Sequence, residues 1–474
     1  MNQPVRFTRL AAIVQGAHLK YLGLGLVLAW HYCLWFVPKT FTRSSWLDER
    51  ATFGWLVALA CTVVTAGTVS LFLGRSRHLP RSPILIWSVS AVGCFATAGV
   101  PVSSDPAIAS AMIYACSAAV GLATGLLWVM WGERYACQRA HFSLRHLGPV
   151  YGLTLFGGLL VVSVLPAIIG TALVALMPLA SGFLLYLSWR EAPVHAFPPM
   201  LPRITTRQVT FRVAAVCMIA FVAAFVCYFT ATIVPWSELI GGVEHSFTIG
   251  IGIGAGLIAL FGLTQTSVPA RPTVTQAMPW LVLASLLACL LCLLNLGGTA
   301  FWMALAVSAL FEVLIIMFMA RLAMSGYAPP ATAFGIGIGA IRAGSCLGNG
   351  LVLIYERNDR LAEAATAPTL IVFVAILAAL LIPLVQQKYS IDDLTREPRD
   401  TTEWAKTVSS IAQQFKLSAR ETEIIDMLGR GYTATAIAER FVISPHTVNK
   451  HVQHIYEKIG IHKRSEMLDF LNKR

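Results

Sequence analysis

The side chains best suited to recognition chemistry lie near the C-terminus, in the stretch Ser444–Ile459. Groups that can donate hydrogen bonds to phosphates or to base edges stand there at Thr447, Asn449, Lys450, His451 and Gln453. An Asn or Gln amide pairs with adenine, and a Lys ammonium pairs with guanine. No acidic residue interrupts this set before Glu457. The stretch therefore has the chemistry of a surface that binds nucleic acid; a solvated helix face is the plainer alternative.

One amphipathic helix is expected to position these groups. Ser444 is a favourable N-cap residue, and Pro445 suits the first helical position. Gly460 is of the type that commonly ends a helix. Apolar residues recur at helical spacing at Val448, Val452, Ile455 and Ile459. The polar set then occupies the opposite face, where it can contact a partner.

Three more helices are expected around this one. Ser418 and Glu421 have the spacing of a capping box and open the sequence ARETEIIDMLG. Residues 433–441 predict a second helix, which a tight turn joins to the helix described above, and residues 463–471 predict a last one. A helix, a turn and a second helix form the arrangement that places one helix in the major groove of DNA.

Residues 413–474 resemble the LuxR/NarL-type helix-turn-helix family. The matching residues are Glu421, Glu423, Gly431, Ile437, Ala438, Ile443, Ser444, Thr447, Val448, His451, Lys458, Gly460 and Arg464. The resemblance implies a four-helix domain that binds double-stranded DNA, with its helix-turn-helix motif at about residues 433–452. It also implies that Asn449, Lys450 and Gln453 read bases, and that the domain often dimerises through its last helix.

Phosphate contacts are expected from Lys450, His451 and Lys458, and these make binding sensitive to salt. Residues 401–474 hold 11 Lys and Arg against 8 Asp and Glu. A domain with so small an excess of positive charge is expected to bind DNA weakly by itself. A homodimer on paired half-sites is therefore expected.

The composition of the whole chain is that of a membrane protein, because 57% of its 474 residues are hydrophobic and 12% are charged. Apolar runs long enough to span a bilayer occur twelve times, at residues 20–38, 52–73, 83–101, 107–130, 148–166, 168–189, 212–235, 247–266, 279–298, 300–321, 331–354 and 366–386. The expected fold is all-α: a polytopic bundle of twelve transmembrane helices, then the small helix-turn-helix domain. Residues 1–386 form the membrane domain and residues 387–412 a linker, with a short helix within residues 402–415.

The charges of the predicted loops indicate the orientation. With twelve spans both termini lie on the same side, and on that side the segments before residue 387 hold fifteen Lys and Arg residues. The segments on the opposite side hold five. Because positive charge accumulates in cytoplasmic loops, both termini are expected in the cytoplasm of a multi-pass protein of the cell membrane.

The predicted spans divide into two sets of six. The polar, Pro-rich loop 191–208 separates residues 1–190 from residues 209–386. The sequence GIGIGA occurs at Gly250–Ala255 and again at Gly335–Ala340, three spans later. It indicates either an internal repeat or close packing of small residues. In its 6+6 layout, the membrane part resembles the major facilitator superfamily.

Two ionisable residues fall at membrane depth, where charge is costly and usually functional. Glu312 lies deep in the tenth span and Arg342 deep in the eleventh. Adjacent antiparallel helices would allow the two side chains to pair. The pair would act as a ligand anchor or a switchable ion pair, or it would be a permanent structural bridge.

Other residues could line a central cavity with this pair, because the resemblance implies that spans one, four, seven and ten surround the substrate path. An aromatic and polar lining suits a small organic ligand; placement in interfacial aromatic belts is the alternative for each Trp and Tyr. The full set of candidate ligand-binding residues is His31, Trp35, Trp128, Trp131, Tyr228, Trp236, Glu238, Glu312 and Arg342.

These observations favour a membrane-embedded, one-component transcription regulator controlled by a small molecule. A transporter with a regulatory DNA-binding tail is the main alternative, and a membrane anchor without a ligand is a third. The sequence has no phosphate-binding loop, nucleophile elbow or metal-ligand cluster. No enzymatic activity, catalytic residue, cofactor or metal site is therefore expected.

Overall fold

The computed structural model describes residues 22–37, 49–73, 79, 82–99, 106–137, 147–191, 206–235, 237, 239, 242–265, 274–324, 327–385, 401–429, 434–441, 443–461 and 466–467. Within these residues the regular structure is helical and contains no strand. Twelve helices of this part precede residue 386, namely α2 (Gly23–Phe36), α3 (Glu49–Leu73), α4 (Pro83–Gly99), α5 (Pro106–Ala136), α6 (Leu147–Val164), α7 (Ala167–Glu191), α8 (Thr206–Ile233), α9 (Gly242–Gln265), α10 (Val274–Leu293), α11 (Gly297–Met324), α12 (Pro330–Glu356) and α13 (Asp359–Val385). Each overlaps one predicted apolar run, so the prediction of an all-α, twelve-helix fold is confirmed.

These helices have the composition of membrane spans. In the described part of the chain, seven helices are long and apolar enough to cross a membrane, and five others are shorter apolar helices. Large apolar side chains remain exposed on the outside of the bundle, for example Phe72 on α3, Phe95 on α4 and Trp280 on α10. An exterior of this kind suits contact with lipid. Helices α2–α13 therefore form a multi-pass membrane domain.

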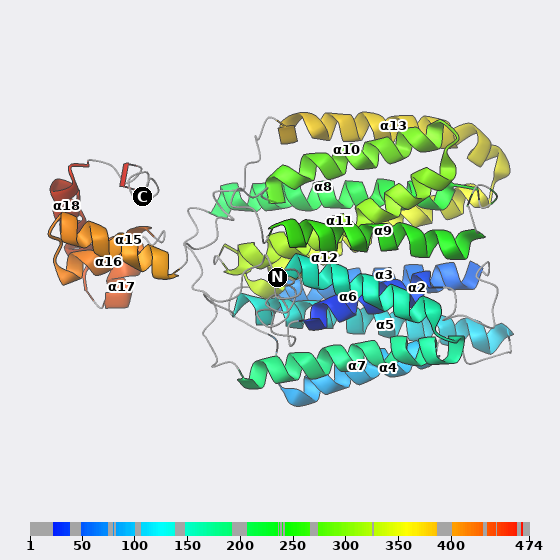
Figure 1. Ribbon diagram of the computed structural model, residues 1–474, viewed down its shortest axis with the longest axis horizontal. Coiled ribbons are helices and arrows are strands. Elements are labelled where there is room, and N and C mark those ends of the chain that lie inside the picture. Colours follow the sequence, from blue (N-terminus) through cyan, green and yellow to red (C-terminus); the bar gives the residue numbers. More distant parts are fainter. Residues whose placement is uncertain are drawn as a thin grey trace, which may run out of the picture.

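The two sets of six helices pack in a repeated pattern. Helices α4 and α7 pack together at one edge of the bundle, and α10 and α13 pack together at the opposite edge (Figure 1). The two halves, α2–α7 and α8–α13, meet where α3 packs on α12 and where α6 packs on α9. Helices α3 and α9 are the second helices of their halves, and α6 and α12 are the fifth. The same two positions thus meet twice, which agrees with the expected 6+6 organisation.

Glycines bring α9 and α12 close to their neighbours. A β-carbon at Gly254 would stand 2.9 Å from the carbonyl oxygen of Ala306 on α11. One at Gly335 would stand 2.6 Å from the carbonyl oxygen of Ala66 on α3. Both glycines belong to the repeated GIGIGA sequences, so these sequences serve close packing of helix backbones.

A second, small bundle follows the membrane domain (Figure 1). Its helices are α15 (Thr401–Gln414), α16 (Ala419–Gly429), α17 (Ala434–Phe441) and α18 (Pro445–Ile459). The predicted capping box opens α16: the Ser418 N–H donates to Glu421 Oε2 at 2.7 Å, and the Glu421 N–H donates to Ser418 Oγ at 3.2 Å. Apolar side chains from all four helices form one buried core.

The small bundle begins earlier than the predicted domain boundary. Val408 and Ile411 of α15 are buried in the same core as Ile424 and Ile425 of α16. Residue 413 therefore lies within α15, a helix that packs into this core. Of the predicted last helix, only residues 466 and 467 are among those described; both are helical, and Met467 is buried in this core.

The close approach of α12 to α8 gives a test of this packing. A β-carbon at Gly348 would stand 2.4 Å from the Phe225 carbonyl oxygen, so Gly348→Ala forces backbone apart and should destabilise the membrane domain by about 1–3 kcal/mol. A β-carbon at Gly350 on the same helix meets no atom within 4 Å. Gly350→Ala should therefore be neutral or slightly stabilising. Thermal melting in detergent compares the two variants, and equal melting temperatures would contradict the packing.

Candidate functional sites

Helix α18 is fixed at both ends by the residues that the sequence indicates. The Ser444 side chain accepts a hydrogen bond from the Thr447 N–H at 3.1 Å and so caps the N-terminus. At the other end Gly460 has φ of 79°, a left-handed conformation that favours glycine. Its N–H donates to the Tyr456 carbonyl oxygen at 2.8 Å. The helix is therefore held in one register, with its apolar face in the core of the small bundle.

The predicted DNA-reading groups lie on the open face of α18. The side chains of Asn449, Lys450 and Gln453 are exposed, and His451 is half-buried. Asn449 and Gln453 are four residues apart and so lie on the same side of the helix. Thr447 is exposed too, but its hydroxyl lies 2.8 Å from the N-cap hydroxyl. The arrangement presents two amides and one ammonium group together to a partner.

Lys458 has a different position from the one expected for a phosphate contact. Its Nζ donates to Glu421 Oε2 at 2.6 Å and to the Lys416 carbonyl oxygen at 3.4 Å. The Glu421 carboxylate is buried between α16 and α18. Lys458 therefore joins α18 to α16, and its contact with DNA stays a prediction.

The same ion pair governs the ionisation of Glu421. Burial acts to raise the pKa of the carboxyl group. Hydrogen bonds from Lys458 and from Ser418, with the positive charge of Lys458, outweigh burial and hold the pKa below its ordinary value of 4.5. The carboxylate is therefore charged at neutral pH and stabilises the contact between α16 and α18.

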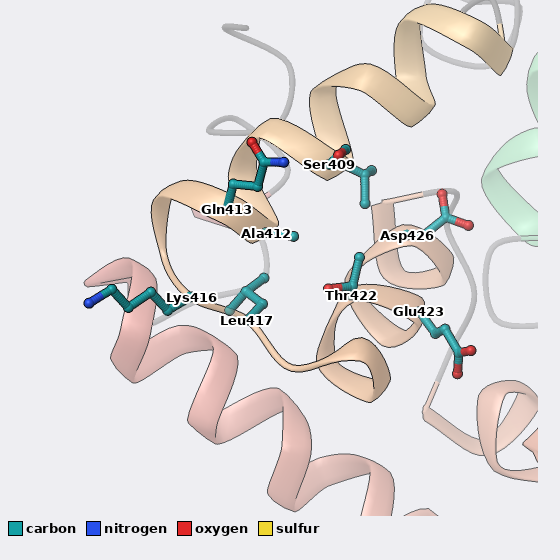
Figure 2. Close-up of a pocket in the computed structure, with 9 residues that line it drawn as sticks. Ser409, Ala412, Gln413, Lys416, Leu417, Thr422, Glu423 and Asp426 are labelled. Carbon is teal, nitrogen blue, oxygen red and sulfur yellow. The ribbon is translucent and has the colours of Figure 1, made fainter.

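A cleft of about 590 Å³ lies between α15 and α16 of the small bundle. Figure 2 shows that Ser409 and Gln413 come from α15, and that Glu423 and Asp426 come from α16. Glu423 also accepts a hydrogen bond from Arg420 at 2.8 Å. None of the DNA-reading residues of α18 lines this cleft. The cleft and the polar face of α18 are thus separate surfaces.

The charged residues predicted at membrane depth meet in the structure. Glu312 on α11 and Arg342 on α12 form an ion pair, and both side chains are only 1% exposed. Tyr32 on α2 donates its hydroxyl hydrogen bond to Glu312 Oε2 at 2.7 Å. The Nε2 atom of His31, also on α2, lies 3.1 Å from Arg342 Nη1. We call these four residues the polar cluster; it joins the first half of the membrane domain to the second.

Aromatic rings adjoin the polar cluster. The ring of Phe36 lies 5.7 Å from that of Tyr32 and 5.2 Å from that of Trp55 on α3. The Trp55 ring lies 5.5 Å from Tyr228 on α8, and the Phe36 ring lies 5.1 Å from Phe247 on α9. These five rings, the aromatic layer, come from both halves of the membrane domain. Like the polar cluster, the aromatic layer depends on the apposition of the halves.

The remaining candidates for the ligand site have varied positions. Trp35 and Trp128 are buried within the membrane domain. Trp131 donates to Ser181 Oγ on α7 at 3.0 Å, so its indole N–H is engaged within the first half. Trp236 and Glu238 lie outside the described residues. The structure thus brings together His31, Glu312, Arg342 and Tyr228, and it places Trp131 elsewhere.

Three residues of this region were missed from the sequence: Tyr32, Phe36 and Trp55. Tyr32 and Phe36 are four residues apart on α2 and share one face, which is a signal that helical spacing offers. Trp55 contacts them only through tertiary packing, for which the sequence carries no periodic signal.

A second buried charged group lies near the end of α5. Arg134 follows the predicted span 107–130, lies within α5 and is 2% exposed. Its Nη2 donates to the Ser188 carbonyl oxygen at 2.9 Å. Beside it, Glu133 accepts a hydrogen bond from the Leu79 N–H at 3.1 Å. These contacts hold the end of α5 against its neighbours.

Comparison with known proteins identifies the small bundle. Residues 416–471 match the family model described as bacterial regulatory proteins, luxR family. Oxygen regulatory protein NreC of Staphylococcus epidermidis is 37% identical over 68 residues, which are 14% of this chain and 31% of the relative. Probable transcriptional regulatory protein NarL of Mycobacterium tuberculosis is 43% identical over 49 residues, 10% of this chain and 23% of the relative. The predicted LuxR/NarL-type domain is confirmed, although this chain spans less than a third of the length of either relative.

The membrane domain has a neighbour of known structure. It is a bacterial homologue of the iron transporter ferroportin, in an outward-facing crystal structure with soaked iron. The likeness has a TM-score of 0.51 at 12% identity and covers 77% of this chain and 99% of that one. At this identity it shows the fold alone. The membrane domain thus shares the fold of this neighbour over most of the chain.

The Glu421–Lys458 pair predicts a pH dependence for the small bundle. Because the pKa of Glu421 is lower in the folded state, its stabilisation is complete above the unfolded pKa and is lost as pH falls through the folded one. Glu421→Gln should lower the melting temperature of residues 401–474 at neutral pH, and its difference from wild type should shrink as the pH falls below the ordinary carboxyl pKa of 4.5. Circular dichroism melting across this range measures both.

Glu457→Gln is the matched control, because Glu457 is exposed on α18 next to Lys458. It should change the melting temperature little at any pH. A Glu421→Gln difference that persisted at low pH would assign the effect to packing and not to charge.

Proposed function

We propose that this protein is a membrane-embedded, one-component transcription regulator. The LuxR-type domain binds promoter DNA, and the transporter-like domain binds a small organic molecule that controls it. The proposal includes no catalytic reaction in either domain. The observation that carries the proposal is the polar cluster, in which residues of α2 contact a buried ion pair of the opposite half.

The polar cluster is suited to a switch because its contacts cross the boundary between the halves. The ion pair lies within the second half, while the Tyr32 and His31 contacts reach it from the first. If the halves separate, the ion pair stays intact and the Tyr32 and His31 contacts break. A ligand shifts such an equilibrium only when it binds one arrangement more tightly than the other. The site of differential binding is therefore placed at this boundary.

The recognition face of α18 supplies the output. Bases are read by Asn449, Lys450 and Gln453, whose side chains are exposed on this helix. Phosphates are contacted by Lys450 and by the half-buried His451. A homodimer on paired half-sites strengthens a weak single domain. Both chain termini are placed in the cytoplasm, as the loop charges indicate.

The DNA-reading role is tested by truncating two exposed side chains of α18. Asn449→Ala with Lys450→Ala should weaken operator binding by roughly 100-fold, because each base contact contributes about 1–3 kcal/mol. A promoter reporter in cells should lose its response for the same reason. His454→Ala, exposed on the same helix, is the control and should keep the response. Unchanged transcription in the double variant would remove the DNA-reading role.

A second candidate function is a small-molecule transporter with a regulatory DNA-binding tail, and the transporter-like fold of α2–α13 favours it. Deletion of residues 400–474 distinguishes the regulator hypothesis from the transporter hypothesis. The regulator hypothesis predicts no substrate flux in proteoliposomes with or without these residues. Flux that survives the deletion would favour the transporter.

A further inference from the structure

We propose that the ligand of the membrane domain is a small organic carboxylate with an aromatic or apolar body, bound through Arg342 and Trp55. This inference rests on the proposed function, because it names the class of molecule that acts at the polar cluster. It also assigns Trp55, which the sequence did not single out, to the ligand site.

The first argument is the set of donors that the site leaves over. Arg342 is 1% exposed, and its Nε has no hydrogen-bond partner among the described residues. Trp55 is 9% exposed, and its indole Nε1 likewise has none. Guanidinium and indole N–H groups only donate, so an acceptor must satisfy them. A buried donor without an acceptor is costly, and a carboxylate oxygen bound at either atom removes that cost there.

The second argument is the occupation of the acceptors. Glu312 Oε1 is held by Arg342, and Glu312 Oε2 accepts from the Tyr32 hydroxyl. An organic cation at the Glu312 carboxylate would lie beside the Arg342 guanidinium and would be repelled by its charge. A carboxylate can instead bind at the free Nε edge of Arg342, where a guanidinium forms strong, directed hydrogen bonds. The site is therefore built for an anion.

The third argument concerns the body of the ligand. Trp55 lies beside Phe36 and Tyr228 in the aromatic layer. Tyr228 in turn interacts electrostatically with Arg342 and Glu312, so the layer and the ion pair adjoin. A ligand whose carboxylate meets Arg342 thus has rings on which an aromatic or apolar body can pack. Trp55 belongs to the first half and Arg342 to the second. Such a ligand therefore favours the arrangement in which the two halves are in contact.

Binding to the full chain in nanodiscs tests the ligand class. The probes are 3-phenylpropionate, its primary amide and 3-phenylpropylamine, which share one ring and differ in charge. We expect 3-phenylpropionate to bind and to raise the melting temperature of the protein. Its dissociation constant should be at least tenfold lower than those of the amide and the amine, a difference in binding free energy of about 1.4 kcal/mol. This comparison uses the wild-type chain and so does not depend on the folding of a variant.

Variants test the named residues. Glu312→Gln removes the competing carboxylate and should tighten 3-phenylpropionate binding, whereas Arg342→Gln should abolish it. Trp55→Phe keeps a ring but removes the N–H and should weaken binding roughly fivefold. Trp302→Phe is the matched control, because Trp302 Nε1 also lacks a described partner but lies ten residues from Glu312 on α11, about 15 Å along the helix. It should bind as wild type does.

The outcomes separate this inference from the proposed function. Tighter binding of the amine, with loss of that binding in Glu312→Gln, would overturn the carboxylate class and identify a cation site. Absence of binding by 3-phenylpropionate at roughly 10 mM would also overturn it. If the amine or the amide binds and alters promoter output, the regulator hypothesis stands without the carboxylate. If 3-phenylpropionate binds as expected but leaves promoter output unchanged, the inference stands and the regulator hypothesis fails.

Discussion

The buried ion pair between Glu312 and Arg342 is the interaction on which the membrane domain depends. An ionised side chain at membrane depth is costly unless it is paired and hydrogen-bonded. The pair needs α11 and α12 side by side, and the Tyr32 hydroxyl adds a donor that only the first half provides. The electrostatics of one pair thus couple the packing within the second half to the contact between the halves.

The small bundle uses the same principle at a smaller scale. A buried carboxylate, that of Glu421, is held by Lys458 and by the cap residue Ser418. In both bundles, therefore, a buried acid fixes how helices from different parts of the sequence meet.

The sequence predicted those features that local physics determines. Hydrophobicity located all twelve membrane helices, since a span must be apolar over its length, and residue types at the ends of α16 and α18 predicted their caps. The depths of Glu312 and Arg342 in adjacent spans predicted their pairing. Tyr32, Phe36 and Trp55 escaped because their partners come from distant helices, which periodicity does not report. The helix α15 was predicted, but its packing escaped for the same reason, because its core contacts lie on α16. The ion pair of Lys458 escaped too, because its partner lies 37 residues away.

The inclusion of α15 in the small bundle has a geometric consequence. Only residues 386–400 separate the end of α13 from the start of α15. Even a fully extended stretch of that size reaches no more than roughly 50 Å. If α18 reads DNA as proposed, its target must therefore come within roughly this distance of the membrane domain. Under that proposal, movement of the chromosome, and not diffusion of the protein, sets how fast an operator is found.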